Sequence, residues 1–289
     1  MVNSSHDDSG TNEERPRVRG RRPAPGEPLL DRAFRVLTCF GPDTPVLSLT
    51  ALAARANLPK ATALRIARRL TEHGALERTG SGHYTIGLRL LEIASVAPRG
   101  HGLRTIALPY LQDLRHATRQ HVQLVVREGL ECVLVERLSA HDAQRVMYRV
   151  GGRMPLHATA PGLVLLAFAP TRVQEDFLTT DRPAGEDDQN ATAEALRPRL
   201  AAIRRDRYAV FSRPQWGTLM TGVSAPILDR HHATIAAISV ITPSEQSRPA
   251  AHIPAVVAVA RAITRAMATE TVDLSRDAAA PGDTGCTHR

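Results

Sequence analysis

Residues 47–74 read LSLTALAARANLPKATALRIARRLTEHG, and the spacing of their apolar side chains predicts two short amphipathic helices. The first helix has apolar residues at Leu49, Leu52, Ala53 and Ala56, and the second at Ala63, Ile66 or Ala67, and Leu70. Ser48 is a suitable N-cap for the first helix, because its hydroxyl can accept a hydrogen bond from an amide left unpaired there. Pro59 divides the helices, because the residue before a proline avoids the helical conformation and proline itself suits a first helical turn.

The segments on either side complete a winged helix-turn-helix pattern. Before it, a third helical stripe is formed by Leu30, Ala33, Phe34 and Leu37. After it, Gly74 suits the end of a helix, and residues 75–86 read as strand, glycine turn and strand. Residues 87–97 return to helical spacing, with Leu88, Leu91 and Ala94 or Ser95 on one side, and end before Pro98. We expect a linker helix whose apolar face packs on a second copy of the chain.

Beyond residue 102 the pattern alternates between helix and strand. Helices are expected at residues 105–119, 159–169, 172–178, 191–205 and 251–269, and strands at 121–127, 132–137, 146–150, 208–212, 222–228 and 234–241. This order predicts a mixed α/β (α+β) domain around an antiparallel sheet. The expected organisation is a disordered basic arm at 1–28, a winged helix-turn-helix at 29–87, a linker helix at 88–102, a second domain at 103–270 and a disordered tail at 271–289.

Composition agrees with two folded domains and an anionic partner. The 289 residues are long enough for two cores, and 43% hydrophobic with 23% charged residues excludes wholesale disorder or a collagen. Lysine and arginine number 37 against 29 acidic residues, a net charge of +8, and Lys60 is the only lysine. Arginine binds phosphate through two parallel hydrogen bonds, although a compositional bias would give the same count.

The cysteines and the apolar runs point to the cytoplasm. Cys39, Cys132 and Cys286 are odd in number and widely spaced, which favours a reducing compartment. The N-terminus lacks the apolar core of a signal peptide, and runs such as 163–169 are far shorter than the roughly 18 residues of a membrane span.

No motif for catalysis, a metal or a cofactor is present. G-x-S-x-G, H-E-x-x-H and a glycine-rich phosphate loop are all absent, and the His231-His232 doublet lacks a third ligand. His157 is interpreted as a structural histidine rather than a base, and Cys132 as a small buried hydrophobe. Trp216 is expected either in a core or in a pocket wall.

In a helix-turn-helix, the N-terminal part of the second helix faces base edges in the major groove of DNA. Here Arg65 is best placed to read a guanine, and Thr62 to touch a base or a phosphate. The candidate DNA-binding residues are Lys60, Ala61, Thr62, Arg65, Arg68, Arg69 and the wing residue Arg78. The alternative is a solvated basic face on a structural helix. Further DNA contacts are possible from the wing, at His83, and from the arm, at Arg17, Arg19, Arg21 and Arg22. The alternatives are an ordinary exposed hairpin for the wing and a solubilising tail for the arm.

The sequence resembles the IclR family of bacterial transcriptional regulators over about residues 29–268. The matching segments are Asp31–Leu37, Leu47–Arg55, Leu58–Thr62 with Arg65, Gly82–Leu91, Leu108–Leu111, Arg149–Ala160, Ala225-Pro226 and Ala237–Ser239. The resemblance implies a homodimer or homotetramer that binds a near-palindromic double-stranded DNA operator. It also implies a GAF-like C-terminal domain that binds a small-molecule effector.

The resemblance places effector binding at Ala160, Pro161, Gly162, Ser212, Gly222, Ser239 and Ile241. Several of these depart from the family pattern: Pro161 has no amide hydrogen, and Gly222 and Ile241 stand where the family often has cysteine and serine. Leu163 likewise replaces a common lysine. Since a buried anion needs several donors, these departures predict a larger, less charged effector, such as an aromatic compound, in a mostly apolar pocket. An empty, vestigial pocket is the alternative.

Two other functions remain open at this point. One is a winged-helix DNA-binding protein whose second domain serves only assembly, and the other is an enzyme that carries a basic N-terminal domain. Salt-sensitive binding to specific DNA excludes the enzyme, and a ligand that shifts operator affinity excludes the assembly domain.

Overall fold

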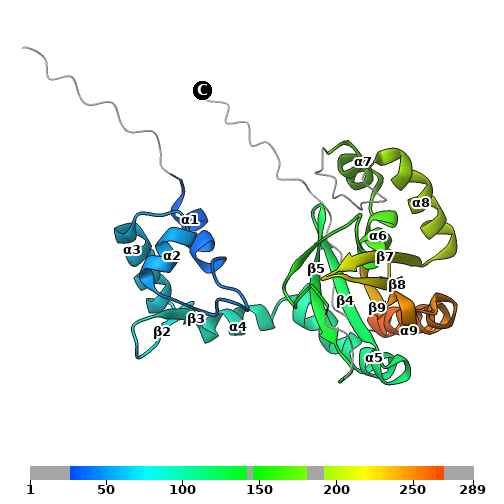
Figure 1. Cartoon of the computed structure of the whole chain (residues 1–289), viewed down its shortest axis with the longest axis horizontal. Helices are drawn as coiled ribbons and strands as arrows, with labels where there is room; N and C mark the ends of the chain where they lie inside the picture. Colours follow the sequence, from blue (N-terminus) through cyan, green and yellow to red (C-terminus); the bar gives the residue numbers. More distant parts are fainter. Residues whose placement is uncertain (1–26, 142–145, 181–191, 270–289) are drawn as a thin grey trace, which may run out of the picture. The chain divides into compact units, whose positions relative to one another are not determined.

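The computed structural model describes residues 27–141, 146–180 and 192–269, in two compact units divided between Leu91 and Glu92 (Figure 1). We call them the N-terminal and the C-terminal unit. Residues 1–26, with the four arm arginines, and residues 270–289, with Cys286, lie outside the described residues.

The N-terminal unit is a winged helix-turn-helix, as the sequence predicted. Its elements are α1 (Leu29–Leu37), β1 (Val46–Leu47), α2 (Leu49–Arg55), α3 (Lys60–Glu72), β2 (Leu76–Arg78) and β3 (Tyr84–Ile86). The strands form an antiparallel sheet in the order β1-β3-β2, of which β1 was not expected. The core beneath them consists of Val36, Leu47, Leu52, Ala56, Ile66, Ala67, Leu76 and Tyr84.

A few residues set the geometry between α2 and α3. The Ser48 hydroxyl accepts a hydrogen bond from the amide of Ala51 at 3.2 Å and caps α2. Asn57 has a φ of 49°, a conformation that asparagine adopts more readily than most residues. Pro59 precedes α3 directly, and Gly74, with a φ of 71°, follows its end.

The apolar stripe predicted for α1 is only partly buried. Leu30 and Phe34 are 71% and 66% exposed, whereas Val36 is fully buried. Ala33 and Leu37 pack against the core from one edge of the helix. The contact of α1 with α2 and α3 is therefore narrower than the stripe, and no other described residue covers the second apolar edge.

The expected linker helix is shorter than predicted. α4 (Leu88–Ser95) begins directly after the wing, where the amide of Leu88 donates to the Glu77 carboxylate at 3.0 Å. It is followed by a π-helical turn, η1 (Pro98–Gly102). None of the α4 side chains is buried, and Leu88 and Leu91 are 62% and 65% exposed.

The C-terminal unit is built on a six-stranded antiparallel sheet in the order β6-β5-β4-β9-β8-β7. The strands are β4 (His121–Glu128), β5 (Glu131–Leu138), β6 (Arg153–Pro155), β7 (Ala209–Gln215), β8 (Thr218–Leu228) and β9 (Thr234–Pro243). The α+β class predicted from the order of elements is confirmed.

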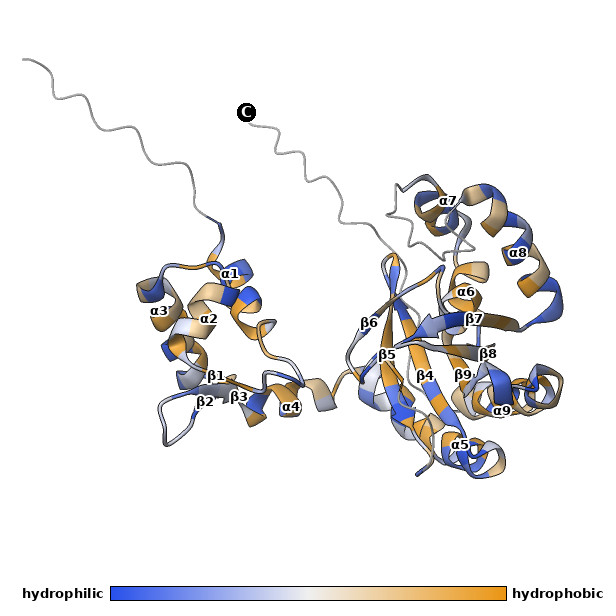
Figure 2. Ribbon diagram, viewed as in Figure 1, coloured by the Kyte–Doolittle hydropathy of each residue, from blue (hydrophilic) through white to orange (hydrophobic). Residues whose placement is uncertain are grey.

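Helices cover both faces of this sheet. α5 (Leu103–Thr118) and α9 (Pro249–Thr269) lie on one face, and α6 (Ala160–Ala167), α7 (Thr171–Thr179) and α8 (Ala193–Asp206) on the other, with a short 3-10 turn, η2 (Ser244–Gln246), after β9. Neighbouring strand residues alternate between the two cores, as Ala237 and Ile238 do. Figure 2 shows the hydrophobic colour of α6, whose eight residues are all buried.

Among the described residues, α9 is long and apolar enough to cross a membrane, with a mean hydropathy of 1.2. Four of its side chains, Val256, Ala260, Ile263 and Met267, are buried in the core that α9 shares with α5 and the sheet. Arg261 and Arg265 are exposed on its outer side. These features are those of an amphipathic helix that covers a sheet.

Residues 146–150, expected as a strand, are a loop instead. The amide of Gly151 donates to Leu134 at 2.7 Å and that of Gly152 to Arg149 at 2.8 Å, while Gly151 has a φ of 77°. This turn redirects the chain, so that pairing with β5 begins only at Arg153. The other expected helices and strands are present with shifted ends.

Gly87→Ala is expected to destabilise the N-terminal unit. A Cβ at residue 87 would lie 2.1 Å from the carbonyl oxygen of Gly74, a backbone atom that cannot rotate away. The free energy of unfolding should fall by about 1–3 kcal/mol, the usual effect of overpacking. Urea unfolding followed by hydrogen exchange of the α2 and α3 amides measures the change.

Gly80→Ala in the wing is the matched control, because no atom lies within 4 Å of a Cβ built there. Its effect should stay below about 0.5 kcal/mol. Equal stability of the two variants would contradict the packing described.

Candidate nucleic-acid interface and ligand pocket

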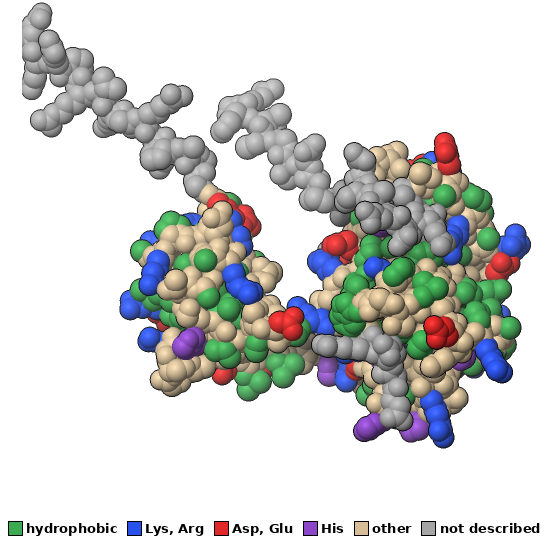
Figure 3. All heavy atoms as spheres, in the orientation of Figure 1, with side chains coloured by type: hydrophobic (Ala, Val, Ile, Leu, Met, Phe, Trp, Pro, Cys, Tyr) green, Lys and Arg blue, Asp and Glu red, His purple; other side chains and the backbone are tan. Residues whose placement is uncertain are grey.

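α3 has one buried apolar face and one exposed basic face. Ala63, Ile66 and Ala67 are buried in the N-terminal unit. The opposite side carries five exposed residues, Lys60, Ala61, Arg65, Arg68 and Arg69, together with the half-buried Thr62. Figure 3 shows basic side chains over this helix. All candidate residues predicted on this helix therefore lie where a ligand could reach them.

The basic side chains of α3 differ in their contacts. Arg69 pairs with Glu72 at 2.6 Å, and both side chains are more than half exposed. Within the described part of the chain, Lys60, Arg65 and Arg68 form no hydrogen bond or ion pair. An exposed pair contributes only about 0.2–1 kcal/mol, so Arg69 can exchange Glu72 for another anion at small cost.

The wing is held by its own side chains. The Arg78 guanidinium donates to the carbonyl oxygen of Gly82 at 3.3 Å, and the Ser81 hydroxyl lies 3.0 Å from the His83 ring. The amide of Thr79 donates to His83 at 2.8 Å. Arg78 is therefore fixed across the wing turn, on an exposed surface.

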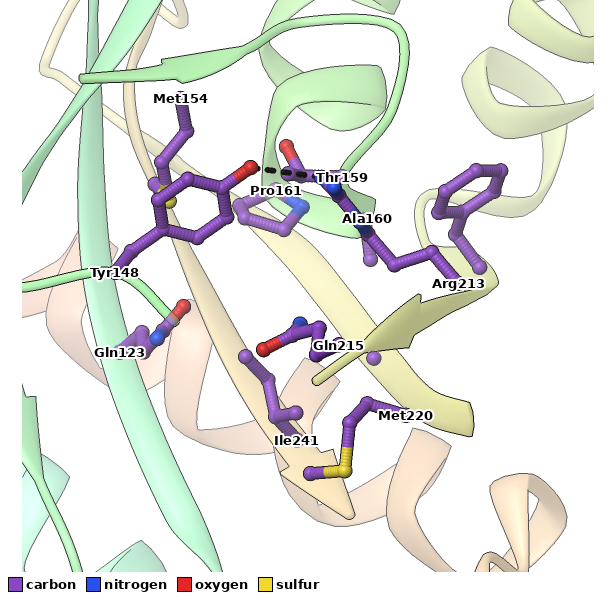
Figure 4. A pocket seen from close by; sticks show the side chains of 12 residues that line it. Gln123, Tyr148, Met154, Thr159, Ala160, Pro161, Arg213, Gln215, Met220 and Ile241 are labelled. Carbon is purple, nitrogen blue, oxygen red and sulfur yellow. Dashed lines mark hydrogen bonds between the residues drawn. The ribbon is translucent and has the colours of Figure 1, made fainter. Parts of the chain in front are cut away.

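A cavity lies in the C-terminal unit between the start of α6 and strands β4, β7, β8 and β9 (Figure 4). Its volume is about 20 Å³, roughly the space of one water molecule. Its lining residues are Gln123, Tyr148, Met154, Thr159, Ala160, Pro161, Phe211, Arg213, Gln215, Met220, Gly222 and Ile241. Arg213 is the one charged residue among them.

The start of α6 forms one wall of the cavity. The Thr159 hydroxyl accepts a hydrogen bond from the amide of Gly162 at 3.1 Å and donates to Pro155 at 3.0 Å. Gly162 therefore has no free amide for a ligand, and Pro161 has no amide hydrogen at all. Two of the three loop positions that the family resemblance implied, Pro161 and Gly162, therefore offer no amide to a ligand.

Two glycines allow the start of α6 to pack tightly against its neighbours. A Cβ on Gly162 would lie 2.4 Å from the carbonyl oxygen of Leu156, and one on Gly222 would lie 3.0 Å from the Cβ of Ala160. A larger residue at 162 would displace α6 from the loop that precedes it, and a larger residue at 222 would push α6 away from β8.

The other predicted effector residues are divided by the structure. Ala160, Pro161, Gly222 and Ile241 line the cavity. Ser212 lies outside it and bonds to Thr221 at 2.8 Å. Ser239 is fully buried and donates to the carbonyl oxygen of Val223 at 3.2 Å. Both serine hydroxyls therefore bond to neighbouring groups of the protein.

Sequence reasoning missed the polar groups that the cavity does contain. The Arg213 guanidinium donates to the Tyr148 hydroxyl at 2.7 Å and to the carbonyl oxygen of Ala158 at 3.1 Å (Figure 4). It also lies 5.7 Å from the centre of the Tyr148 ring. Burial raises the pKa of Tyr148, an effect that Arg213 partly offsets, so the phenol is protonated at neutral pH.

Two buried amides complete the polar lining. Gln123 is 1% exposed, and its side-chain NH2 group has no hydrogen-bond partner among the residues that the structure describes. Gln215 is 6% exposed, and its carbonyl oxygen accepts from the amide of Met147 at 3.0 Å. The sequence signal for both was a polar residue at an inward position of a strand. An unpaired buried amide costs roughly 1–3 kcal/mol, which points to a ligand that pairs with it.

The remaining candidate residues, Cys132 and Trp216, differ in their burial. The described residues contain no group of three metal-ligating side chains. Cys132 is buried, and burial raises its pKa to about 12 although Thr159 partly opposes this. Trp216, expected in a core or a pocket wall, is instead 58% exposed in the turn between β7 and β8, where its φ is 47°.

Comparison with known proteins gives a consistent result. Residues 97–269 match the family described as bacterial transcriptional regulator IclR C-terminal, and residues 29–80 match the IclR helix-turn-helix domain. The glycerol operon regulatory protein of Streptomyces coelicolor is 29% identical over 240 residues, covering 82% of this chain and 94% of that protein. The probable transcriptional regulator SauR of Cupriavidus necator is 30% identical over 215 residues, covering 73% and 84%.

A solved structure is also similar. The crystal structure of an IclR homolog from Microbacterium hydrocarbonoxydans, complexed with 4-hydroxybenzoate, aligns with a TM-score of 0.77 and 33% identity. The alignment covers 83% of this chain and 99% of that one.

Gln123→Met is expected to stabilise the ligand-free protein by about 1 kcal/mol, because it replaces an unpaired buried amide with an apolar chain of similar length. Gln215→Met is the matched control and should destabilise the protein, since it leaves the Met147 amide without its acceptor. Thermal unfolding of both variants shows whether each substitution raises or lowers the stability. Destabilisation by both would mean that Gln123 has a structural partner.

Proposed function

The chain belongs to the IclR family of bacterial transcriptional regulators, and we propose which of its residues bind DNA and effector, and how it assembles. It is a transcriptional regulator with a DNA-binding helix-turn-helix domain and a C-terminal effector domain. The observation that carries the rest is the basic face of α3, which has three cationic side chains without partners in the described chain.

The proposed DNA contacts follow from position on the winged helix-turn-helix. Arg65 extends from the first half of α3 and reads a guanine edge through two hydrogen bonds. Lys60, Arg68 and Arg69 bind phosphates, while Ala61 and Thr62 lie against the groove at the start of the helix. Arg78, fixed across the wing turn, contacts the neighbouring DNA backbone.

The effector pocket is proposed to be the cavity beside α6. Its support is the buried position under the start of α6, the unpaired amide of Gln123 and the cation of Arg213. The similar Microbacterium protein is complexed with a small aromatic acid, which supports a ligand of comparable size for this chain. Such a ligand is larger than the present 20 Å³, so its binding requires the cavity to open.

The protein is proposed to act without catalysis, in the bacterial cytoplasm where its DNA lies. Its relatives are transcriptional regulators. The deeply buried thiol of Cys132 and the mostly apolar cavity lining give no nucleophile or general base for a reaction.

We also propose a homodimer. In the N-terminal unit, large apolar side chains are exposed on α1 and α4, namely Leu29, Leu30, Phe34, Leu88 and Leu91. A single chain leaves these surfaces in water, and a second copy would cover them. A dimer would also present two recognition helices to two half-sites.

Arg65→Ala is expected to weaken binding to the specific operator by about 1–3 kcal/mol and to change binding to random DNA little. Arg69→Ala should weaken binding to both kinds of DNA alike, because a phosphate contact carries no sequence information. It should also lower the slope of log affinity against log salt concentration by about one. Fluorescence anisotropy over a salt series measures both. If Arg65→Ala loses affinity equally on both DNAs, the assignment of base reading to Arg65 is wrong.

Substitution of Leu88 and Leu91 by glutamate should convert the dimer to a monomer, because two charges would replace apolar contact area without disturbing the fold of the exposed helix. Leu130→Glu, at a 37% exposed position between β4 and β5, should leave the dimer intact. Sedimentation velocity distinguishes the species. A wild-type protein that sediments only as a monomer at micromolar concentration would refute the dimer.

A further inference from the structure

We infer that the effector is an organic acid whose carboxylate binds Arg213 by displacing the Tyr148 hydroxyl from it. This inference rests on the proposed function of the cavity as the effector site. It replaces the expectation of a less charged effector, which considered only the positions given by the family resemblance and therefore omitted residue 213.

The charge of the cavity favours an anion. Among the described lining residues, Arg213 is the only charged one, and both of its hydrogen bonds run from one guanidinium nitrogen to neutral oxygens, of Tyr148 and Ala158. The other two nitrogens form no hydrogen bond or ion pair within the described residues. A guanidinium binds a carboxylate through two parallel, charge-assisted hydrogen bonds, which are about twice as strong as neutral ones. An acid is thus the ligand that this cation would select.

The other side of the cavity favours a second polar group on the ligand. Gln123 lies on β4 and Arg213 on β7, and strands β9 and β8 lie between these two. The two intervening strands contribute Ile241, Met220 and Gly222, none of which has a polar side chain. The unpaired NH2 group of Gln123 can donate to a hydroxyl or carbonyl oxygen at the end of the ligand away from the acid.

Tyr148 is the lining residue whose side chain a ligand would displace. It lies on the loop 146–150, which has no strand pairing, and its position depends on three contacts. Arg213 holds its hydroxyl at 2.7 Å, Arg137 holds its carbonyl oxygen at 2.5 Å, and Gln215 holds the preceding amide at 3.0 Å. Only the first of these hydrogen bonds involves the side chain of Tyr148, whose ring also packs against the core under α6.

The displacement therefore exchanges one planar group on Arg213 for another. The cavity is too small for the acid while the phenol ring of Tyr148 lines it. When this ring moves away, the ring or chain of the acid occupies the space that it leaves. Figure 4 shows Arg213 extended toward the Tyr148 hydroxyl, the position that the carboxylate would take. The ligand-free protein is thus held closed by a contact that an acid competes for.

The test uses the full chain and three acids, benzoate, 4-hydroxybenzoate and 4-hydroxyphenylacetate, each paired with its neutral primary amide. In calorimetric titrations, at least one acid should bind, and its amide should bind at least about tenfold more weakly, because the charge-assisted bonds are lost. Arg213→Gln should lose this preference for the acid. Equal binding of acid and amide, or an unchanged preference in Arg213→Gln, overturns the inference.

Tyr148→Phe separates displacement from direct ligand contact. It keeps the ring and removes the hydroxyl that occupies Arg213, so the acid should bind as tightly as to the wild type or several-fold more tightly. Weaker binding would show that the hydroxyl holds the ligand. If no acid binds to either protein, the alternative of an empty, vestigial pocket is favoured. Both results overturn the inference.

A measurement of DNA binding distinguishes a failure of this inference from a failure of the proposed function. Binding of the wild-type protein to its operator is measured beside the titrations by fluorescence anisotropy. A wild-type protein that binds its operator and ignores every acid refutes the inference alone. A wild-type protein without specific DNA binding refutes the proposed function.

Discussion

The close approach of α6 to the sheet is the constraint on which the C-terminal unit depends. Gly162 and Gly222 leave no room for a side chain between this helix and its neighbours, and all eight residues of α6 are buried. The Thr159 hydroxyl fixes the start of the helix and uses the amide of Gly162. One wall of the cavity is therefore rigid, and its polar character must come from the strands and from the loop at residues 146–150.

Arginines of both units differ in whether they have a partner. In the C-terminal unit several arginines pair with acids or backbone oxygens, such as Arg197 with Glu175 at 2.8 Å and Arg199 with Val210 at 3.1 Å. On α3, Arg65 and Arg68 have no such partner in the described chain. Exposed ion pairs contribute little to stability, so the unpaired cations on α3 matter for their position: they lie on the helix that fits a major groove, where they can bind phosphates and base edges.

The sequence predicted much of the fold but little of the pocket chemistry. Helical spacing, Ser48 and Pro59 were sufficient for the helix-turn-helix, because these are local signals. The exposure of Leu30 and Phe34 was missed, since an apolar stripe does not say whether its own chain or another covers it. Arg213 and Gln123 were missed because the inward face of a strand depends on its register with neighbours, which periodicity alone does not fix.

DNase I footprinting of the full chain on the DNA that flanks its own gene tests the central claim most directly, namely that this is a sequence-specific DNA-binding regulator. The account predicts one discrete protected region with two related half-sites, centred about one or more helical turns apart, that persists in excess random DNA. Protection that spreads evenly along the fragment, or that random DNA abolishes, would contradict it.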